Sequence, residues 1–487
     1  MMTAKFSTDE IIKATGGIPK YTVDVDIDAV FPGISTDTRT ISTGEVFFAL
    51  IGENHDAHDH LDEAASKGAA LLVVSDSSKA PTCYEGTVLV VKDVQRAYQD
   101  LAAYYRKTLD PFVIAVTGSV GKTTMKDMIA CILSKHARVW HTQGNLNNQI
   151  GLPRTILEAP EDTEILVLEM GLAYAGDIER LAEIALPDVS IITNIGLSHR
   201  ENFDTDDGIL RAKYEICAFL DEDGTLVIDA GGNAELDRLA AEGSREKGYG
   251  LVRIAMENTA AVETADYIVT KTRISEEDPG VTLFEIKTGH AGDAVPFAIP
   301  VPGSYAGVSA AMASAACRFA GVSLTDSAKA LENLERTPHR LAPAIIGGVL
   351  IIDDTYNSSP DSAMSGLDYL VNVKAEARIA VLADMNELGD EAESIHRTIG
   401  AAAANMDIDR IYVYGEKARW IADGAEEEIG GQCEKIIYFG ADDKETLIER
   451  LKEEVVEGRA IYIKGSRSMK MEEVVLALTE EGINGVV

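Results

Sequence analysis

A glycine-rich segment at residues 117–124, TGSVGKTT, carries the strongest chemical signal in the sequence. Glycines let such a loop curl so that backbone N–H groups face an anion, and the N-terminus of a following helix adds partial positive charge. Lys122 can reach the β- and γ-phosphates of a nucleotide, and Thr123 or Thr124 can bind Mg²⁺. The spacing GxxGKT is shorter than the usual GxxxxGK[ST], whose first glycine is replaced by Val116. A strand, the loop and an amphipathic helix still follow in the required order, which predicts a phosphate-binding loop. Its predicted contacts are Gly118, Ser119, Gly121, Lys122, Thr123 and Thr124.

Two further side chains follow apolar runs that are typical of buried strands. Glu169 comes directly after ILVL, and His199 comes soon after VSIITNIG. Taken alone, Glu169 fits a surface carboxylate and His199 a hydrogen-bonded turn histidine. Open α/β sheets place their ligands at the carboxyl ends of strands, so beside a phosphate loop both residues are predicted to bind Mg²⁺. Lys213 stands at the start of a predicted helix, where a lone lysine is usually solvated. No NKxD-type motif is found, which argues against a GTPase.

Composition excludes several classes of protein. Lys and Arg number 44 and Asp and Glu number 80, so the net charge is −36. Nucleic acids and anionic membranes need positive surface, and neither is an expected partner. No run reaches about 18 apolar residues and the N-terminus has no apolar signal core, so a cytoplasmic protein is expected. The five cysteines show no CxxC spacing, and they predict neither a zinc site nor disulfides.

The elements that must position these residues alternate between strands and helices. A chain of 487 residues suggests about three domains. Alternation predicts the α/β class, with parallel sheets and right-handed crossovers. The predicted domains are residues 1–107, residues 108–338 with the phosphate loop, and residues 339–487. Strands are expected at Glu45–Ile51, Ala70–Val74, Ile165–Leu168, Val189–Thr193, Val349–Ile352, Ile379–Leu382, Ile411–Val413 and Ala460–Ile463, with a β-rich stretch near Ala265–Ala298.

Motifs in all three predicted domains resemble those of one family. They include GISTDTRTISTGEVFFALIGENHDAHDHL, HTQGNLNNQIGLP, LEMGLAYAGDIERLAEIALPDVSIITNIG, AKYEI, IIDDTYNSSPDSAM, VLADMNELGD and IKGSRSMKMEEVV. In this order they are similar to the Mur ligases, and among these to the MurF branch, over essentially the whole chain. The resemblance implies a three-domain fold with a central P-loop doubly wound sheet and a C-terminal Rossmann-like domain. It also implies an ADP-forming, ATP-dependent ligase that acts on a small carboxylate substrate, and a monomer is expected.

The resemblance implies a mechanism and a role for each matching residue. ATP phosphorylates a substrate carboxylate, and a nucleophile then attacks the acyl phosphate. Lys122 would hold the phosphates, Thr123 and Glu169 one Mg²⁺, and His199 a second. Lys213 stands where the family carries a carbamylated lysine, a carboxylate made from an amine and CO₂. Lys122, His199 and Lys213 are thus the expected catalytic residues.

The resemblance further implies contacts from the other domains. Expected nucleotide contacts are Tyr305, Arg340, Asp354 and Asn357, with Asp353 near them. Expected substrate contacts are Ser35, Thr36, Asp37, Arg39, Asn145, Asn147, Asn148, Tyr356, Lys464 and Arg467.

The sequence departs from the MurF pattern at three places. Tyr305 and Ala306 replace the His and Asn of a Gly-x-His-Asn stretch whose Asn meets adenine, and a Tyr305 ring could stack on the base instead. Residues 229–232 read DAGG in place of Asn-x-Asp-Asp, and residues 198–201 read SHRE in place of Ala-His-Leu-Glu.

The chain keeps the phosphate-binding residues of the MurF pattern, while nearby residues expected at the nucleotide or the substrate differ. This combination favours a MurF relative that acts on another substrate. The first prediction is the coenzyme F-430 synthetase of methanogenic archaea, which closes a carbocyclic ring on a nickel tetrapyrrole. The alternative is MurF itself, the UDP-MurNAc-tripeptide D-alanyl-D-alanine ligase of peptidoglycan synthesis. A nucleotide-binding regulator without catalysis is a third possibility, against which the presence of Lys122, Glu169, His199 and Lys213 speaks.

Overall fold

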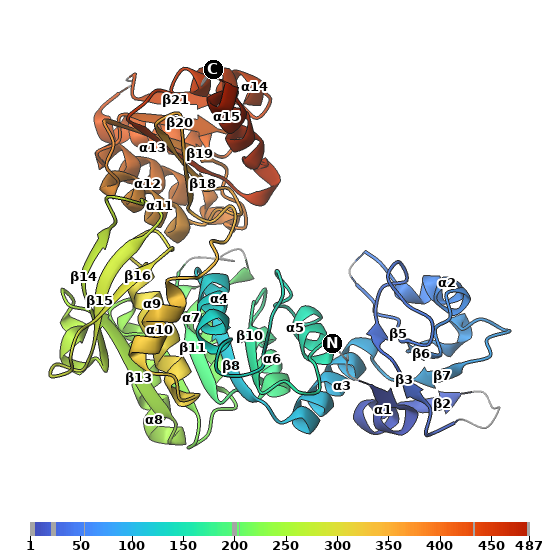
Figure 1. Cartoon of the computed structure of the whole chain (residues 1–487). Helices are drawn as coiled ribbons and strands as arrows, with labels where there is room; N and C mark the ends of the chain where they lie inside the picture. Colours follow the sequence, from blue (N-terminus) through green and yellow to red (C-terminus); the bar gives the residue numbers. More distant parts are fainter. Residues whose placement is uncertain are drawn as a thin grey trace.

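Three α/β parts follow one another along the chain (Figure 1). The computed structural model describes residues 5–20, 26–52, 54–196, 202–203, 205–431 and 434–484. The N-terminal and C-terminal parts lie against different regions of the central part, which carries the phosphate loop (Figure 1). This arrangement confirms the predicted α/β class with a central parallel sheet.

The N-terminal part is built on a five-stranded sheet of order β2-β7-β6-β5-β4. Strands β4 to β7 run parallel, and β2 pairs antiparallel with β7 at the edge. The apolar runs in β5 and β6 are buried, as a sheet covered on both faces requires. Its elements are β1 (Phe6–Ser7), α1 (Thr8–Thr15), β2 (Ile18–Lys20), β3 (Val30–Phe31), β4 (Ile34–Ser35), β5 (Val46–Phe48), η1 (Ala57–His60), α2 (Leu61–Ser66), β6 (Leu71–Val74), β7 (Thr87–Val90) and α3 (Val94–Leu109).

The central part holds a nine-stranded sheet of order β16-β15-β14-β13-β12-β11-β8-β10-β9. Strands β8 to β14 run parallel, and β15 and β16 extend the sheet antiparallel. Helices α4, α9 and α10 cover one face, while α3, α5, α6, α7 and α8 cover the other. Its elements are β8 (Phe112–Thr117), α4 (Lys122–Leu133), β9 (Val139–His141), α5 (Gly151–Leu157), β10 (Ile165–Glu169), α6 (Asp177–Ala185), β11 (Val189–Ile192), α7 (Asp206–Tyr214), β12 (Thr225–Asp229), α8 (Ala234–Lys247), β13 (Gly250–Met256), β14 (Tyr267–Ile274), β15 (Thr282–Thr288), β16 (Val295–Ile299), α9 (Ala306–Phe319) and α10 (Leu324–Leu331).

The C-terminal part holds a six-stranded sheet of order β17-β18-β22-β19-β20-β21, parallel except for the edge strand β17. Helices α11, α12 and α13 pack on one face, and α14 and α15 on the other. Its elements are β17 (Ala342–Ile346), β18 (Val349–Asp354), α11 (Pro360–Asn372), β19 (Ala377–Ala383), α12 (Ala392–Asn405), β20 (Arg410–Tyr414), α13 (Arg419–Ile429), β21 (Ile436–Phe439), α14 (Lys444–Lys452), β22 (Arg459–Lys464) and α15 (Glu472–Asn484).

The three parts are joined in different ways. Helix α3 packs into one continuous apolar cluster that contains Phe48 of the N-terminal sheet and Leu168 of the central sheet. The predicted boundary at residue 107 falls inside this helix, and the domain limits stay a prediction. The C-terminal part has its own apolar clusters, and it meets the central part through Ile274 of β14, which packs against one of these clusters, and through polar contacts. One is a hydrogen bond of 2.6 Å from the Tyr369 hydroxyl to the carbonyl of Pro279, in the hairpin between β14 and β15.

Each strand expected from an apolar run corresponds to a strand of the structure, and the β-rich stretch near Ala265–Ala298 forms β14, β15 and β16. Within the described ranges, no helix is long and apolar enough to cross a membrane.

Candidate active site

The phosphate loop lies between β8 and α4 at the carboxyl edge of the central sheet. Gly118 has φ 145° and Gly121 has φ 84°, conformations that glycine adopts more readily than other residues. A Cβ at Gly118 would also lie 1.9 Å from the hydroxyl of Thr193. The turn therefore needs these glycines, and α4 begins immediately afterwards at Lys122.

Asn194, just after β11, braces the loop. Its Oδ1 accepts hydrogen bonds from the N–H groups of Ser119 at 3.0 Å and Val120 at 2.9 Å. The Thr193 hydroxyl donates to the carbonyl of Val120 at 2.7 Å. Asn194 was not among the predicted site residues, although the rule that identified Glu169, a polar residue at the carboxyl end of a buried strand, also applies to the segment TNIG.

Lys122 folds back over its own loop. Its ammonium donates to the carbonyls of Gly118 at 2.7 Å and Ser119 at 3.3 Å. Burial lowers the pKa of Lys122; Glu169 opposes this shift and Arg340 adds to it. The contacts to two carbonyls keep the ammonium at the loop, where phosphate oxygens could replace those carbonyls.

Glu169 ends β10 and is 2% exposed. Its Oε1 accepts a hydrogen bond of 2.7 Å from Asn147. Its Oε2 is buried and has no hydrogen-bond partner among the described residues. An unpartnered buried carboxylate oxygen is costly, and it fits a cation that the protein would bind there.

The surroundings of Glu169 fit a Mg²⁺ site. Among the described residues, no three His, Cys, Asp or Glu side chains gather into a metal-binding group. Mg²⁺ typically uses one or two carboxylates together with phosphate and water oxygens. Thr123, in the first turn of α4, is the predicted second protein ligand. His199, the predicted ligand of another Mg²⁺, lies outside the described residues.

Lys213 lies in the last turn of α7 and not at the start of a helix, as the sequence suggested. It is 1% exposed, so it is not the solvated lysine that its place on a helix alone would favour. Burial and the charge of Lys122 lower its pKa to about 7, against an opposing effect of Asp361. In a large fraction of the molecules, Lys213 is therefore a neutral amine near neutral pH. The neutral amine is the form that can react with CO₂.

The linker into the C-terminal part reaches the phosphate-loop helix. The Arg340 guanidinium carbon lies 4.2 Å from the ring centroid of Tyr356, which is cation–π geometry. Arg340 Nη2 also lies 3.5 Å from the hydroxyl oxygen of Thr123. Beside this contact is a small cavity of about 30 Å³, which is lined by Thr124, Asp127, Pro300, Val301, Pro302, Leu334, Glu335, Arg336, Thr337, Arg340, Leu341 and Ala342.

Asp354 and Lys464 are paired with each other in the interior. Lys464 is 1% exposed, and its ammonium donates to Asp354 Oδ2 at 2.6 Å and to the carbonyl of Asn357 at 3.0 Å. The Tyr462 hydroxyl donates to the same Asp354 oxygen at 3.0 Å. These contacts hold the loop after β18, so in this structure both residues support the loop that carries Tyr356 and Asn357.

The other residues expected to contact the nucleotide or the substrate lie in several separate segments of the central and C-terminal parts. The loop after β10 and the loop that holds Asn147 meet at Glu169, while Asn148 Oδ1 accepts a hydrogen bond of 2.9 Å from the N–H of Gly151, the first residue of α5. Asn145 is exposed, and Tyr305 is 59% exposed just before α9. Arg467 forms an ion pair of 3.3 Å with Glu472.

The expected substrate contacts Ser35, Thr36, Asp37 and Arg39 lie together in the N-terminal part. Ser35, at the end of β4, accepts at Oγ a hydrogen bond of 3.2 Å from the N–H of Asp37, and Thr36 lies between them half-buried. Arg39 pairs with both carboxylate oxygens of Asp37, and this hydrogen bonding lowers the pKa of Asp37 to about 2. The Arg39 side chain is 84% exposed and is therefore accessible to an anion.

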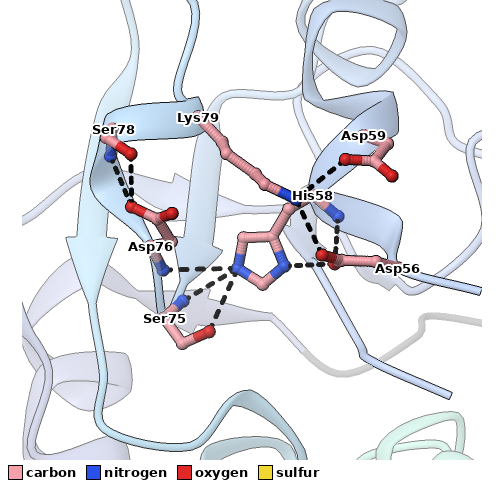
Figure 2. A network of polar contacts seen from close by, with 7 residues as sticks. All are labelled: Asp56, His58, Asp59, Ser75, Asp76, Ser78 and Lys79. Carbon is pink, nitrogen blue, oxygen red and sulfur yellow. Dashed lines mark hydrogen bonds and ion pairs between the residues drawn. The ribbon is translucent and has the colours of Figure 1, made fainter.

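A buried histidine braces the same part of the molecule (Figure 2). His58 Nδ1 lies 2.7 Å from Asp56 Oδ1, and Nε2 lies 3.2 Å from Ser75 Oγ, a Ser-His-Asp order. However, Nε2 already accepts the backbone N–H of Ser75 at 3.0 Å. A ring nitrogen occupied by an amide is a poor base for the hydroxyl, and Lys79 also holds Asp56 at 2.8 Å. The network therefore ties η1 to the end of β6 and is structural.

Comparison with known proteins places this geometry in a family. Residues 116–317 match the Mur ligase middle domain, and residues 339–467 match the Mur ligase glutamate ligase domain. The chain is 36% identical to the UDP-N-acetylmuramoyl-tripeptide–D-alanyl-D-alanine ligase of Bacillus subtilis, over 98% of each chain. It is 35% identical to the ligase of the same name from Escherichia coli, over 94% of this chain and 95% of that one.

Solved structures give the same result. A crystal structure of MurF from Acinetobacter baumannii has a TM-score of 0.86 and 29% identity, and the match covers 99% of this chain and 100% of that one. MurF from Thermotoga maritima in complex with ADP has a TM-score of 0.80 and 27% identity, over 93% and 98% of the two chains.

These similarities overturn the first functional prediction. Full-length relatives are ligases of the MurF type, so the prediction of a coenzyme F-430 synthetase, with its links to nickel and methanogenesis, is wrong. The departures at Tyr305, residues 198–201 and residues 229–232 therefore do not by themselves indicate another substrate. The chain belongs to the Mur ligase family as an ATP-dependent ligase that resembles MurF over its whole length.

Proposed function

We propose that this enzyme joins D-alanyl-D-alanine to UDP-MurNAc-tripeptide with hydrolysis of ATP to ADP. The observation that carries the choice of substrates is the full-length similarity to the ligases named above. That similarity extends over the N-terminal part, which lies outside both matched family domains and which we propose binds the uridine nucleotide. The domains would divide near residues 107 and 338, and the active form would be a monomer.

The first half of the reaction makes an acyl phosphate. A carboxylate oxygen of the tripeptide attacks the γ-phosphorus of ATP, the bond to the β,γ-bridging oxygen breaks, and ADP leaves. Lys122 and the loop amides would hold the phosphates, and Arg340 would approach them from the linker. Thr123 and Glu169 would hold Mg²⁺, which offsets the negative charge of the transferred group when bound.

The second half makes the amide bond. The amine of D-alanyl-D-alanine attacks the acyl carbonyl and loses a proton, and phosphate leaves from the tetrahedral intermediate. Lys213 as a carbamate would, together with His199, supply the ligands of a second Mg²⁺. The burial and lowered pKa of Lys213 support this role, because a carbamate forms from the neutral amine. Closure of the C-terminal part would keep water from the acyl phosphate.

We assign the remaining contacts on position and chemistry. Tyr305, Arg340, Asp354 and Asn357 would surround the nucleotide, with Thr124 in the wall of the neighbouring cavity. The substrate would meet Ser35, Thr36, Asp37, Arg39, Asn145, Asn147, Asn148, Tyr356, Lys464 and Arg467. Asp354 and Lys464 also hold the loop after β18, so they would position Tyr356 and Asn357 for these contacts.

Release of ADP tests the proposal. The full chain is mixed with ATP, Mg²⁺, UDP-MurNAc-tripeptide and D-alanyl-D-alanine, and we expect ADP release that requires both substrates and a product of the summed mass less water. L-Alanyl-L-alanine serves as the matched control and should give little ADP. The Lys122→Ala variant should be inactive yet folded. A folded enzyme that binds ATP but releases no ADP with these substrates would contradict the assignment.

A further inference from the structure

The linker between α10 and β17 contains a strained turn. His339 has φ 61° and Leu341 has φ 45°, so two residues with side chains adopt left-handed backbone on either side of Arg340. Such conformations are costly for residues other than glycine, and they persist only where the surroundings hold them. Strain of this kind clusters at functional sites, where specific contacts hold the backbone in place.

Backbone contacts tie the turn to the loop after β18. The N–H of Leu341 donates to Asp354 Oδ1 at 3.2 Å, and the N–H of Tyr356 donates to the carbonyl of His339 at 3.0 Å. The Leu341 side chain packs against the apolar cluster of the C-terminal part. The linker and the loop that carries Tyr356 are therefore one unit.

The side chain of His339 adds a specific anchor. Its Nδ1 lies 2.8 Å from Asp353 Oδ2, and the other oxygen of Asp353 accepts the N–H of Thr355 at 3.2 Å and its hydroxyl at 2.7 Å. Because a carboxylate only accepts, Nδ1 carries the hydrogen of this bond. Asp353 is held by its own loop and is 14% exposed, so it is a fixed point for the histidine.

We propose that His339 is a positioning residue for nucleotide binding. Its bond to Asp353 holds the left-handed turn, and the turn directs the Arg340 guanidinium between the Tyr356 ring and Thr123 of the phosphate-loop helix. The inference rests on the proposed role of Arg340 at the nucleotide phosphates. His339 itself does not touch the ligand.

Three substitutions separate the anchor from the strain. His339→Ala removes the anchor and keeps a side chain in the strained turn. His339→Gly removes the anchor and relieves the strain, because glycine adopts positive φ readily. His339→Asn keeps both, because an Asn side-chain N–H can replace Nδ1–H and Asn tolerates left-handed backbone better than most residues.

Calorimetric titration of the full chain with AMP-PNP and Mg²⁺ tests the proposal without either acceptor substrate. We expect His339→Ala and His339→Gly to raise the Kd for AMP-PNP about tenfold, because each loses one charge-assisted hydrogen bond. The Kd of His339→Asn should stay within about twofold of the wild-type value. His339→Gly should lose affinity although its Tm is no lower than that of wild type, which a purely structural role would not produce. His290→Ala, on an exposed turn, is the matched control.

Arg340→Ala distinguishes failure of the inference from failure of its premise. If Arg340→Ala binds AMP-PNP as wild type does, the proposed role of Arg340 is wrong and the inference ends with it. If Arg340→Ala binds weakly while all three His339 variants bind normally, the premise stands and the inference is overturned. Loss of affinity in His339→Asn equal to that in His339→Ala also overturns it. Should His339→Ala not fold, His339→Gly gives the same test without strain.

Discussion

Asn147 donates a hydrogen bond of 2.7 Å to one carboxylate oxygen of Glu169, while the other oxygen is buried without a partner in the described part of the chain. The amide fixes the orientation of the carboxylate, and the second oxygen remains available to a ligand. Glu169 lies at the end of β10, next to β8 and its phosphate loop, with Glu169 and Val116 as register partners. Glu169 therefore offers one carboxylate oxygen beside the phosphate loop, as the proposed Mg²⁺ ligand requires.

Glu169→Gln should weaken Mg²⁺ binding without unfolding the protein. The amide is nearly isosteric but carries no charge, so the Mg²⁺ concentration for half-maximal ADP release should rise at least ~10-fold, as loss of a ligand or its support does elsewhere. A Mg²⁺ titration of the rate at saturating ATP measures this. Glu161→Gln, at an exposed position, is the control. If Glu169→Gln requires the same Mg²⁺ concentration as wild type, Glu169 is not a ligand of the metal.

Asn194 should matter through hydrogen bonding and not through charge. Its Oδ1 accepts the N–H groups of Ser119 and Val120, so Asn194→Ala should loosen the loop and weaken ATP binding about tenfold. Asn194→Asp keeps an acceptor at that position but adds negative charge beside the phosphates, so it should bind ATP at least as weakly while the loop stays ordered.

Titration with AMP-PNP measures both effects. Amide hydrogen exchange at Ser119 and Val120 then tells them apart, because it should speed up in Asn194→Ala and remain slow in Asn194→Asp. Equal affinity in all three proteins would mean that the brace has no role in nucleotide binding.

Some of this site could be predicted from the sequence, and the reasons are local. The run ILVL identified β10, and the rule of ligands at carboxyl strand ends then identified Glu169. The glycines of the phosphate loop were equally visible, because their spacing is read along the chain. A local pattern thus predicted both the strand and the candidate metal ligand at its end.

Other features depend on contacts between distant residues. Asp354 and Lys464 are register partners on β18 and β22, so their ion pair exists only once the sheet order is known. The burial of Lys213 depends on how α7 packs on the sheet. The prediction of the substrate was wrong because three altered motifs were weighted more than similarity over the whole length.

Lys213→Ala should abolish most activity, and small carboxylic acids should restore part of it. The proposed carbamate supplies a carboxylate at the end of a long side chain, and the variant leaves a space there that acetate or formate could enter. ADP release is measured with increasing acetate at constant ionic strength, with chloride as the matched salt. Full activity of Lys213→Ala without added acid would rule out a role for this lysine.

His396 should make the stability of the protein depend on pH. Its ring is fully buried, with Nδ1 placed 2.6 Å from the carbonyl of Ala392 and Nε2 accepting the N–H of Met385 at 3.0 Å. Burial is the largest cause that lowers the pKa of His396 from its ordinary value of 6.5. Just below pH 6.5, His396 is therefore protonated in the unfolded chain but still neutral in the native state. The free energy of unfolding consequently falls as pH falls through this range.

His396→Gln removes that titration and keeps an acceptor for Met385. Loss of the second hydrogen bond should make the variant about 1–2 kcal/mol less stable than wild type at about pH 8. The difference should shrink at about pH 5.5, because only wild type continues to lose stability through this group. Urea unfolding at both pH values measures the two free energies, and His136→Gln, at an exposed position, should show no such convergence. If the difference between wild type and His396→Gln is the same at both pH values, His396 does not make the stability of the protein depend on pH.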